Sequence, residues 1–445
     1  MLETTPSYNL KVIVRETGIK PDTLRAWERR YGLPVPQRTA GGHRLYSQRD
    51  LDTVKWLMAR EREGMRIGQA VQLWRDLEAG GQDPLHQPAV VGPPPGKRAM
   101  PAATLADLSA LREAWVSACL SYDEAGAEQQ LAHALARHAP ELVSLELLQK
   151  GMSEIGRLWY ENKATAQQEH FASAIALRRI NALLASAPPP TRRQTIYLAS
   201  PPREEHAFPP LLLTLLLRYR GWPASFLGPN LPIEELEATL AAQRPALFIL
   251  AAQTLPTAAA ALEMARFLQS QQTPVAYGGL IYNRLPALRD KMPGHFLGEQ
   301  LDEAASRAGA ILEAAATLRA GDPVDKSYRL ALACFERQRR FLEGQVWLRM
   351  IDQGITSGYL QVANEHLQQG ICAALAFGDM ALLDHEIDWV RGLLANHEVP
   401  VQVLTAYLVA YREVAREQLG PDCGPVVAWL DGVESRVPEL TSPSR

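Results

Sequence analysis

Between residues 194 and 319, short β-rich runs alternate with segments of helical period, and this alternation restricts the fold of the chain more than any other feature. The expected strands cover residues 194–200, 223–228, 246–252, 274–278 and 295–297. The last helix is expected from Leu301 to near Arg319. Strands and helices that alternate at this spacing predict a doubly wound parallel sheet of about five strands, flavodoxin-like (Rossmann-type) in style.

A purely helical segment precedes the sheet and ends at Pro188-Pro189-Pro190. Its apolar residues recur at three- and four-residue spacing in four runs, which cover residues 105–119, 123–137, 140–160 and 166–187. Short breaks separate the runs, so the segment is expected to form an antiparallel four-helix bundle.

Near the start of the chain, residues 8–21 predict a short helix that ends in a Gly turn, and a second helix begins at Pro21. Two short helices across such a turn are typical of the helix-turn-helix. A Gly-Gly hairpin tip with basic and aromatic neighbours follows and predicts a wing. Arg is well suited to contact guanine edges and phosphates. The expected DNA contacts of helix and wing are Thr23, Arg25, Arg29, Arg30, Arg38, His43, Arg44 and Tyr46.

The length of 445 residues exceeds what one hydrophobic core supports, so the chain is expected to be multidomain, with α and α/β parts. A Pro/Gly-rich linker follows the head, and another break at Gly321 opens a helical C-terminal region of five or six helices. The expected division is a winged-helix domain, a linker, the bundle, the α/β domain and the C-terminal helical domain, at 1–79, 80–103, 104–188, 189–320 and 321–445.

Charge is distributed unevenly: residues 1–77 carry 14 Lys or Arg against 9 Asp or Glu, whereas residues 323–445 carry 11 against 16. A basic head fits a nucleic-acid module. The four cysteines are widely spaced and include no CxxC pair, so neither a disulfide framework nor a thiolate zinc site is expected. They are Cys119, Cys334, Cys372 and Cys423. No apolar run is long enough for a membrane span, so a cytoplasmic protein without a membrane partner is expected.

The loop after the first predicted strand carries Glu204 and His206. Ligands of open parallel sheets bind outside the carboxyl ends of strands, which is where His206 falls. A neutral imidazole can bind a metal there, and Glu204 can accept its other ring proton, which fixes the tautomer and raises the basicity of the ligand. The alternative is an ordinary polar loop.

Two further groups of residues are candidates for a ligand site. Gly278 and Gly279 close the fourth predicted strand, and two residues without side chains let a bulky planar or nucleotide group approach the backbone. In the bundle, Trp159 lies at the end of one helix, and nine residues separate it from Glu169-His170 in the next. Taken alone, a Trp and a His on apolar helices are more often core residues.

The string LRxWERRYGLPxPxRTxGGHRLYS, nearly complete over residues 24–47, resembles the MerR family of winged-helix regulators. The resemblance extends from Tyr8 to about Leu77, with a helix after the wing from Leu51. It implies a dimer that binds a pseudo-palindromic, double-stranded operator. The segment from Leu51 to Leu77 is short for the long coiled coil of such regulators, so the dimer contact is expected further along the chain.

The bundle, the flavodoxin-like sheet, the Glu204-x-His206 loop and the late Gly-Gly resemble cobalamin-binding domains. Together with the head, residues 8–319 resemble the CarH/LitR class of light-sensing, B12-dependent regulators. This resemblance implies that His206 is the lower axial cobalt ligand of adenosylcobalamin, and that Trp159, Glu169 and His170 cap the upper face. It also implies a dark-state oligomer, often a tetramer, that falls apart in light, and no catalytic turnover.

Two positions depart from the pattern of that class. Pro209 stands where the loop has a Gly, which removes backbone freedom near the nucleotide tail. Tyr160 follows the Trp where light-sensing members place a His, and it joins the expected cofactor contacts. Two other interpretations stay open: a corrinoid-dependent methyltransferase or mutase component, and a scaffold that has lost the cofactor.

The acidic C-terminal region lies beyond any family likeness. Its aromatic residues are expected to be mostly core, and an oligomerisation or partner-docking role is the main interpretation. A second chromophore, with bilin or another tetrapyrrole as the specific guess, is the alternative. The polar residues considered for it are His366, Cys372, His385 and His397, whose spacings match no ligand motif.

Overall fold

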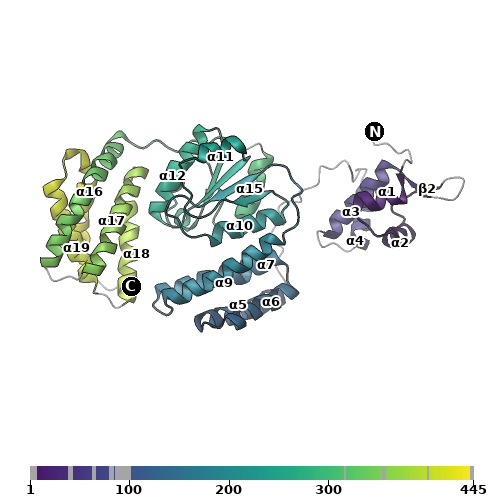
Figure 1. Ribbon diagram of the computed structural model, residues 1–445, viewed down its shortest axis with the longest axis horizontal. Coiled ribbons are helices and arrows are strands. Elements are labelled where there is room, and N and C mark those ends of the chain that lie inside the picture. Colours follow the sequence, from purple (N-terminus) through teal and green to yellow (C-terminus); the bar gives the residue numbers. More distant parts are fainter. Residues whose placement is uncertain are drawn as a thin grey trace. The chain divides into compact units, whose positions relative to one another are not determined.

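A computed structural model describes residues 8–38, 44–62, 67–79, 85, 102–314, 317–352, 357–397 and 400–440. The chain divides into two compact units, residues 1–98 and 99–445, and each is described by itself (Figure 1). None of the helices in the described ranges combines the length and the apolar character that a bilayer crossing requires.

The first unit contains a helix-turn-helix and a small antiparallel sheet. Helices α1 (Leu10–Thr17) and α2 (Pro21–Tyr31) are joined by a turn in which Gly18 adopts φ 73°, a left-handed conformation that favours glycine. The strands β1 (Tyr8–Asn9), β2 (Gln37–Arg38) and β3 (Arg44–Tyr46) form a sheet of order β1-β3-β2. Helices α3 (Gln48–Arg62) and α4 (Ile67–Ala79) complete the unit. The winged helix-turn-helix prediction is confirmed.

The second unit begins with the helical bundle. Its elements are α5 (Ala102–Leu120), α6 (Glu124–Arg137), α7 (Pro140–Val143), η1 (Ser144–Gln149), α8 (Lys150–Tyr160) and α9 (Ala166–Ala185). The third predicted run, 140–160, is therefore continuous but contains a π-helical stretch, η1. Arg112 donates to the carbonyl of Glu146 within this stretch, at 3.1 Å. Side-chain insertion of this kind accompanies local departures from α-helical geometry.

A parallel sheet follows the bundle, in the order β5-β4-β6-β7-β8, which is the flavodoxin order. Its strands are β4 (Ile196–Ala199), β5 (Ala224–Phe226), β6 (Leu247–Ala251), β7 (Val275–Gly278) and β8 (His295–Phe296). The connecting helices are α10 (Phe208–Tyr219), α11 (Leu236–Ala242), α12 (Leu255–Ser270), α13 (Leu280–Arg284) and α14 (Leu288–Lys291), and α15 (Leu301–Glu313) follows β8. Each predicted strand is present, whereas α15 ends before the expected Arg319.

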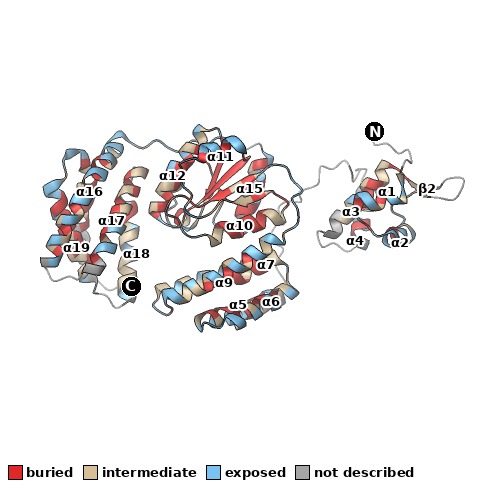
Figure 2. Cartoon of the chain, in the orientation of Figure 1, coloured by how far each residue is buried: buried red, intermediate tan, exposed pale blue. Residues whose placement is uncertain are grey.

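The sheet separates two hydrophobic cores, since successive side chains of a strand point to opposite faces. On β6, Leu247 and Ile249 belong to the core shared with α10, α15 and the bundle, whereas Phe248 and Leu250 belong to the core shared with α12. Figure 2 shows the strands as buried, with helices on both sides. Because helices cover both faces of the sheet, the loops at its carboxyl edge are the places where polar residues can be exposed to a ligand.

The C-terminal region is all-helical, as expected, and comprises α16 (Lys326–Asp352), α17 (Ser357–Phe377), α18 (Leu382–Asn396), α19 (Val401–Gln418), a 3-10 turn η2 (Pro421–Cys423) and α20 (Gly424–Leu440). Its buried residues form one continuous cluster with those of α12 and the adjoining face of the sheet. The C-terminal region therefore shares a hydrophobic core with the α/β domain and is not a separately folded domain on a linker. Tyr407, Tyr411 and Trp429 are core residues, which agrees with the expectation for its aromatic side chains.

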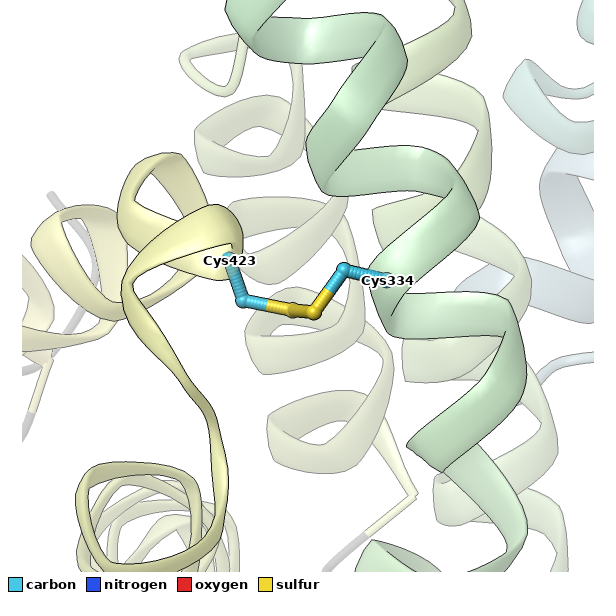
Figure 3. Close-up of a disulfide and its surroundings, with 2 residues drawn as sticks. All are labelled: Cys334 and Cys423. Carbon is cyan, nitrogen blue, oxygen red and sulfur yellow. A yellow bond between two sulfur atoms is a disulfide. The ribbon is translucent and has the colours of Figure 1, made fainter.

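One cysteine expectation was wrong. Cys334 of α16 and Cys423 of η2 form a disulfide, whereas none was expected from the cysteine spacing (Figure 3). The two residues are 89 positions apart, and packing of η2 against α16 brings them together. Cys119 and Cys372 are free.

Candidate functional site

The loop between β4 and α10 presents an imidazole held by a buried carboxylate. Glu204 is 1% exposed, and its Oε1 contacts Nδ1 of His206 at 2.5 Å. The side chain of His206 is 64% exposed, and the structure gives its Nε2 no hydrogen-bond partner among the described residues. An imidazole fixed through Nδ1 and open at Nε2 is the arrangement that metal-binding histidines use.

Glu204 is held by more than His206. Its Oε1 also accepts the backbone N–H of His206 at 3.1 Å, and its Oε2 accepts from the backbone N–H of Gln253 and the hydroxyl of Thr257, each at 2.7 Å. Gln253 and Thr257 follow β6, the neighbour of β4, so the carboxylate ties the two strand ends together at the switch point of the sheet. Neither Gln253 nor Thr257 was predicted from the sequence as part of the site.

The electrostatics of the pair favour an ionised carboxylate next to the imidazole. Burial raises the pKa of Glu204, but hydrogen bonds from His206, Thr257 and Gln253 outweigh burial and hold it below its usual value. The hydrogen bond to Glu204 raises the pKa of His206, burial opposes this rise, and the charges of Glu204, Glu169 and Glu205 add to it. Because Glu169 lies on α9, the start of that helix is within electrostatic range of the His206 loop.

The two glycines at the end of β7 have different surroundings. A Cβ on Gly278 would meet nothing within 4 Å, so the open space expected for an approaching group is present there. Gly279 has a φ of 124°, and a Cβ on it would overlap the carbonyl oxygen of Ala252. Contact with its own neighbouring strand therefore accounts for Gly279, whether or not a ligand approaches it.

Pro209 fits its position without strain. It lies in the first turn of α10, which carries Pro at its N-terminal positions. The backbone N–H groups of a first turn have no intrahelical acceptor, so a missing N–H costs little there. Pro at this position is accommodated by the start of α10.

The bundle residues singled out from the sequence gather at the ends of α8 and α9. Nδ1 of His170 contacts Oε2 of Glu169 at 2.8 Å, and the side chain of His170 is 81% exposed. The hydroxyl of Ser173 donates to the other oxygen of Glu169 at 2.8 Å. Trp159 and Tyr160, the last two residues of α8, are half-buried and contact residues of α18. This contact with the C-terminal region has no local signal in the sequence.

In the first unit, α2 presents a basic surface over a buried stripe. Leu24 and Trp27 face the core, whereas the predicted contacts on this helix, Thr23, Arg25, Arg29 and Arg30, are exposed. Among the described residues, two of these arginines make weak local contacts, Arg25 with the exposed Asp22 at 3.2 Å and Arg29 with the carbonyl of Arg25 at 3.4 Å. Their guanidinium groups are free to turn toward a phosphate or a base edge.

The wing residues divide into three groups. Tyr46 is fully buried and its hydroxyl donates to Glu28 at 2.6 Å, so we withdraw it from the expected DNA contacts and assign it to the core. Arg44 is partly exposed and donates to the other oxygen of Glu28 at 2.8 Å. His43 and the side chain of Arg38 lie outside the described residues.

Family models match both units. The model described as a MerR HTH family regulatory protein matches residues 8–77, and the model described as a B12 binding domain matches residues 111–184, the region of the bundle. The HTH-type transcriptional repressor CarH of Myxococcus xanthus is 30% identical to this chain over 298 residues, which are 66% of this chain and 96% of that protein. The chain belongs to the MerR-family regulators that carry a B12-binding domain.

Two further comparisons accompany this assignment. The HTH-type transcriptional repressor CarA of Myxococcus xanthus is 27% identical to this regulator over 312 residues, which cover 68% of this chain and 96% of that protein. The monomethylamine corrinoid protein of Methanosarcina barkeri superposes with a TM-score of 0.40 at 17% identity, over 46% of this chain and 98% of its own.

The residues of the loop fit a corrinoid. A bound corrinoid would bring the ring nitrogens that hold its cobalt, so a single donor from the protein would complete the site. His206 offers Nε2, and the buried Glu204 fixes the ring through Nδ1. Gly278 leaves open space at the end of β7, two strands from β4 in the same sheet.

Proposed function

We propose that this regulator is a cobalamin-dependent, light-responsive transcriptional regulator that binds operator DNA as an oligomer. The observation that carries the proposal is the imidazole of His206, fixed through Nδ1 by a buried carboxylate and open at Nε2. The similarity to two repressors of Myxococcus xanthus supports a role in transcription.

On the lower side, His206 binds cobalt through Nε2 in this proposal. Glu204 keeps the ring proton on Nδ1, and Gln253 and Thr257 hold Glu204 in place. Gly278, Gly279 and the surrounding strand ends accommodate the nucleotide tail. The roles of these residues are to bind and to orient, because the chemistry belongs to the cofactor.

On the upper side, Trp159, Tyr160, Glu169 and His170 surround the axial group. The exposed His170 and its partner Glu169 are available to a polar ligand such as the ribose of an adenosyl group. Adenosylcobalamin, the form we propose, supplies a cobalt–carbon bond that light breaks. Trp159, Tyr160, Glu169 and His170, at the ends of α8 and α9, would hold the adenosyl group.

For DNA binding, Thr23, Arg25, Arg29 and Arg30 on α2, and Arg38, His43 and Arg44 of the wing, are the proposed contacts. A dimer or tetramer brings two such heads to a pseudo-palindromic operator, because operator symmetry follows protein symmetry. Occupation of the corrinoid site sets the oligomeric state, and the oligomeric state sets the affinity for DNA.

The test is one preparation measured in three ways, in darkness and after illumination. Apoprotein is incubated with adenosylcobalamin, freed of excess cofactor, and followed by absorbance, by size-exclusion chromatography and by gel shift on its own promoter region. We expect retained colour in darkness, and changes in spectrum, apparent mass and DNA binding on illumination. A protein that stays colourless would favour the cofactor-free scaffold instead.

A second tetrapyrrole is proposed only for one place, a pocket of about 380 Å³ between the C-terminal region and the α/β domain, lined in part by Tyr160, Trp389, Arg284 and His385. Tyr160 and Trp389 offer aromatic walls to a planar ring, and Arg284 offers one cation. Glu386 and Asp388 also line the pocket, so its charge disfavours a ring that carries several carboxylates. Among the described residues, no group of three metal-binding side chains occurs. Purified protein incubated with biliverdin should acquire a visible band that Trp389→Ala abolishes, and a band that survives this change would exclude the pocket.

A further inference from the structure

Helix α18 of the C-terminal region and the residue after it, His397, lie against two of the four bundle residues assigned to the upper face, Tyr160 and Trp159. The rings of Tyr160 and Trp389 stack, with centroids 5.9 Å apart and an interplanar angle of 27°. The rings of Trp159 and His397 are 6.3 Å apart. The separation of more than two hundred residues between partners makes this a tertiary contact with no local cause.

The contact is specific as well as close. The side-chain amide of Asn396 donates to the backbone carbonyl of Tyr160 at 3.0 Å, which caps the end of α8. The hydroxyl of Tyr160 lies 3.4 Å from the carbonyl of Trp389. Trp389, Gly392 and Asn396 follow one another at helical spacing and form one stripe of α18.

Gly392 is required at this contact by its neighbour. A Cβ on residue 392 would overlap the hydroxyl oxygen of Tyr160. A glycine inside a helix is unfavourable relative to alanine, so its presence here is explained by the close approach of the tyrosine. Tyr160 is the last residue of α8, and α18 therefore fixes the position of its side chain.

The same helix also touches the α/β domain. The guanidinium of Arg284, at the end of α13, lies 5.8 Å from the ring centre of Trp389. Helix α13 begins directly after Gly279, at the carboxyl edge of the sheet. Trp389 thus contacts both Tyr160 at the end of α8 and Arg284 near the carboxyl edge of the sheet, the two places between which the proposed function puts the upper side of the corrinoid.

Behind Trp159, Nε2 of His397 is buried without a hydrogen-bond partner among the described residues. Buried ring nitrogens normally have a hydrogen-bond partner, and this one has none among the described residues. His397 therefore contacts Trp159 through its ring and not through a hydrogen bond. A shift of Trp159 changes the surroundings of His397 directly.

We propose that α18 is the outer wall of the upper corrinoid face: Trp389, Gly392 and Asn396 position Tyr160, and His397 supports Trp159, so that the C-terminal region sets which upper axial group the site accepts. This inference rests on the proposed function. A wall that holds the capping residues in place favours a bulky adenosyl group that packs against them, and has little effect on a small hydroxo group. By linkage, the axial group then affects how firmly α18 is docked.

The test is a cycle of two substitutions read with two corrinoids. Gly392→Ala introduces the overlap with Tyr160, and Tyr160→Phe removes the hydroxyl with which it overlaps. Gly344→Ala is the matched control, because a Cβ on this helical glycine of the same region meets nothing within 4 Å. Affinities for adenosylcobalamin and hydroxocobalamin are measured by equilibrium titration in darkness, and urea unfolding of each apoprotein is measured alongside.

Gly392→Ala should weaken adenosylcobalamin binding by about 10-fold, the effect of a modest steric overlap, and change hydroxocobalamin binding by less than about 2-fold. Adding Tyr160→Phe to Gly392→Ala should restore most of the ratio of the two affinities, and Gly344→Ala should leave it unchanged. A general loss of stability would lower both affinities alike and would not recover in the double variant.

An unchanged ratio in Gly392→Ala, with both corrinoids bound by the wild-type protein, overturns this inference and leaves the proposed function standing. Wild-type protein that binds neither corrinoid overturns the proposed function and this inference with it. In the apoproteins, a lowered unfolding midpoint in Gly392→Ala that Tyr160→Phe does not restore also counts against the contact.

Discussion

Replacement of Glu204 by Gln tests how the site holds its imidazole. The carboxylate accepts two N–H groups of His206 on Oε1, and the N–H of Gln253 and the hydroxyl of Thr257 on Oε2. Glutamine has the same shape but one accepting oxygen. If that oxygen faces His206, the backbone N–H of Gln253 loses its acceptor, at a cost of about 1–3 kcal/mol.

If the amide oxygen faces Gln253 instead, its NH₂ group faces His206. The imidazole can then pair with it only by moving its proton from Nδ1 to Nε2, which blocks the atom proposed to bind cobalt. Either orientation therefore costs stability, and one of them also disables the ligand. We expect Glu204→Gln to weaken cobalamin binding by about 10–100-fold, the usual effect of losing a partner of a metal-binding His.

The assay is titration of apoprotein with adenosylcobalamin in darkness, followed by absorbance, together with urea unfolding of the apoprotein. Glu205→Gln is the control, since Glu205 is the exposed neighbour in the same loop. It changes the local charge in the same way without removing an acceptor that the structure shows. Wild-type affinity and wild-type spectrum in Glu204→Gln would refute the role assigned to the buried carboxylate.

Four other predictions follow from the structure. Ala in place of Arg25, Arg29 or Arg30 should cost about 1–3 kcal/mol at one base pair, or lower the salt slope of operator binding by about one, and gel shifts unchanged for all three would remove α2 from the DNA. Tyr46→Phe should destabilise the isolated head by about 1–3 kcal/mol, because the buried end of Glu28 loses a donor, and base preference should not change in the folded variant. Burial raises the pKa of Glu128, but hydrogen bonds from Arg179 and Arg178 lower it overall from 4.5. The ionised Glu128 therefore contributes stability above pH 4.5, and this contribution is lost as pH falls through the lower pKa of the folded state. The free energies of unfolding of wild type and Glu128→Gln should therefore converge in that acid range. A difference that stays constant with pH would contradict the ion pairs. Reduction of the disulfide between Cys334 and Cys423 should lower the free energy of unfolding by up to about 4–5 kcal/mol for so long a loop, and equal urea midpoints with and without reductant would refute its contribution.

The elements that could be predicted from the sequence are those set by local pattern. The run from Leu247 to Ala251 is apolar throughout because both faces of β6 are covered, and such runs between turn residues identify parallel strands. His206 could be located because a loop that follows a parallel strand has to lie at the carboxyl edge. Its partner Glu204 could be named for the same reason, since it lies in the same loop.

What could not be predicted depends on partners distant in sequence. Gln253 and Thr257 reach Glu204 only because β6 lies next to β4, and no spacing rule gives that register. Tyr46 was predicted as a DNA contact because it follows a basic hairpin. Its actual partner, Glu28, lies on α2, and the hydrogen bond depends on the packing of β3 against that helix. The disulfide and the docking of α18 on Tyr160 join segments whose contact depends on the whole C-terminal region.

The central claim, that Nε2 of His206 is the lower cobalt ligand, is tested most directly by electron paramagnetic resonance. The protein is prepared with and without ¹⁵N-labelled histidine, loaded with cob(II)alamin, and the nitrogen splitting of the cobalt signal is recorded. We predict that labelling changes the splitting, and that His206→Ala removes this change. A splitting that is the same in labelled and unlabelled protein would show that the nitrogen belongs to the benzimidazole of the cofactor, and would contradict the assignment of His206.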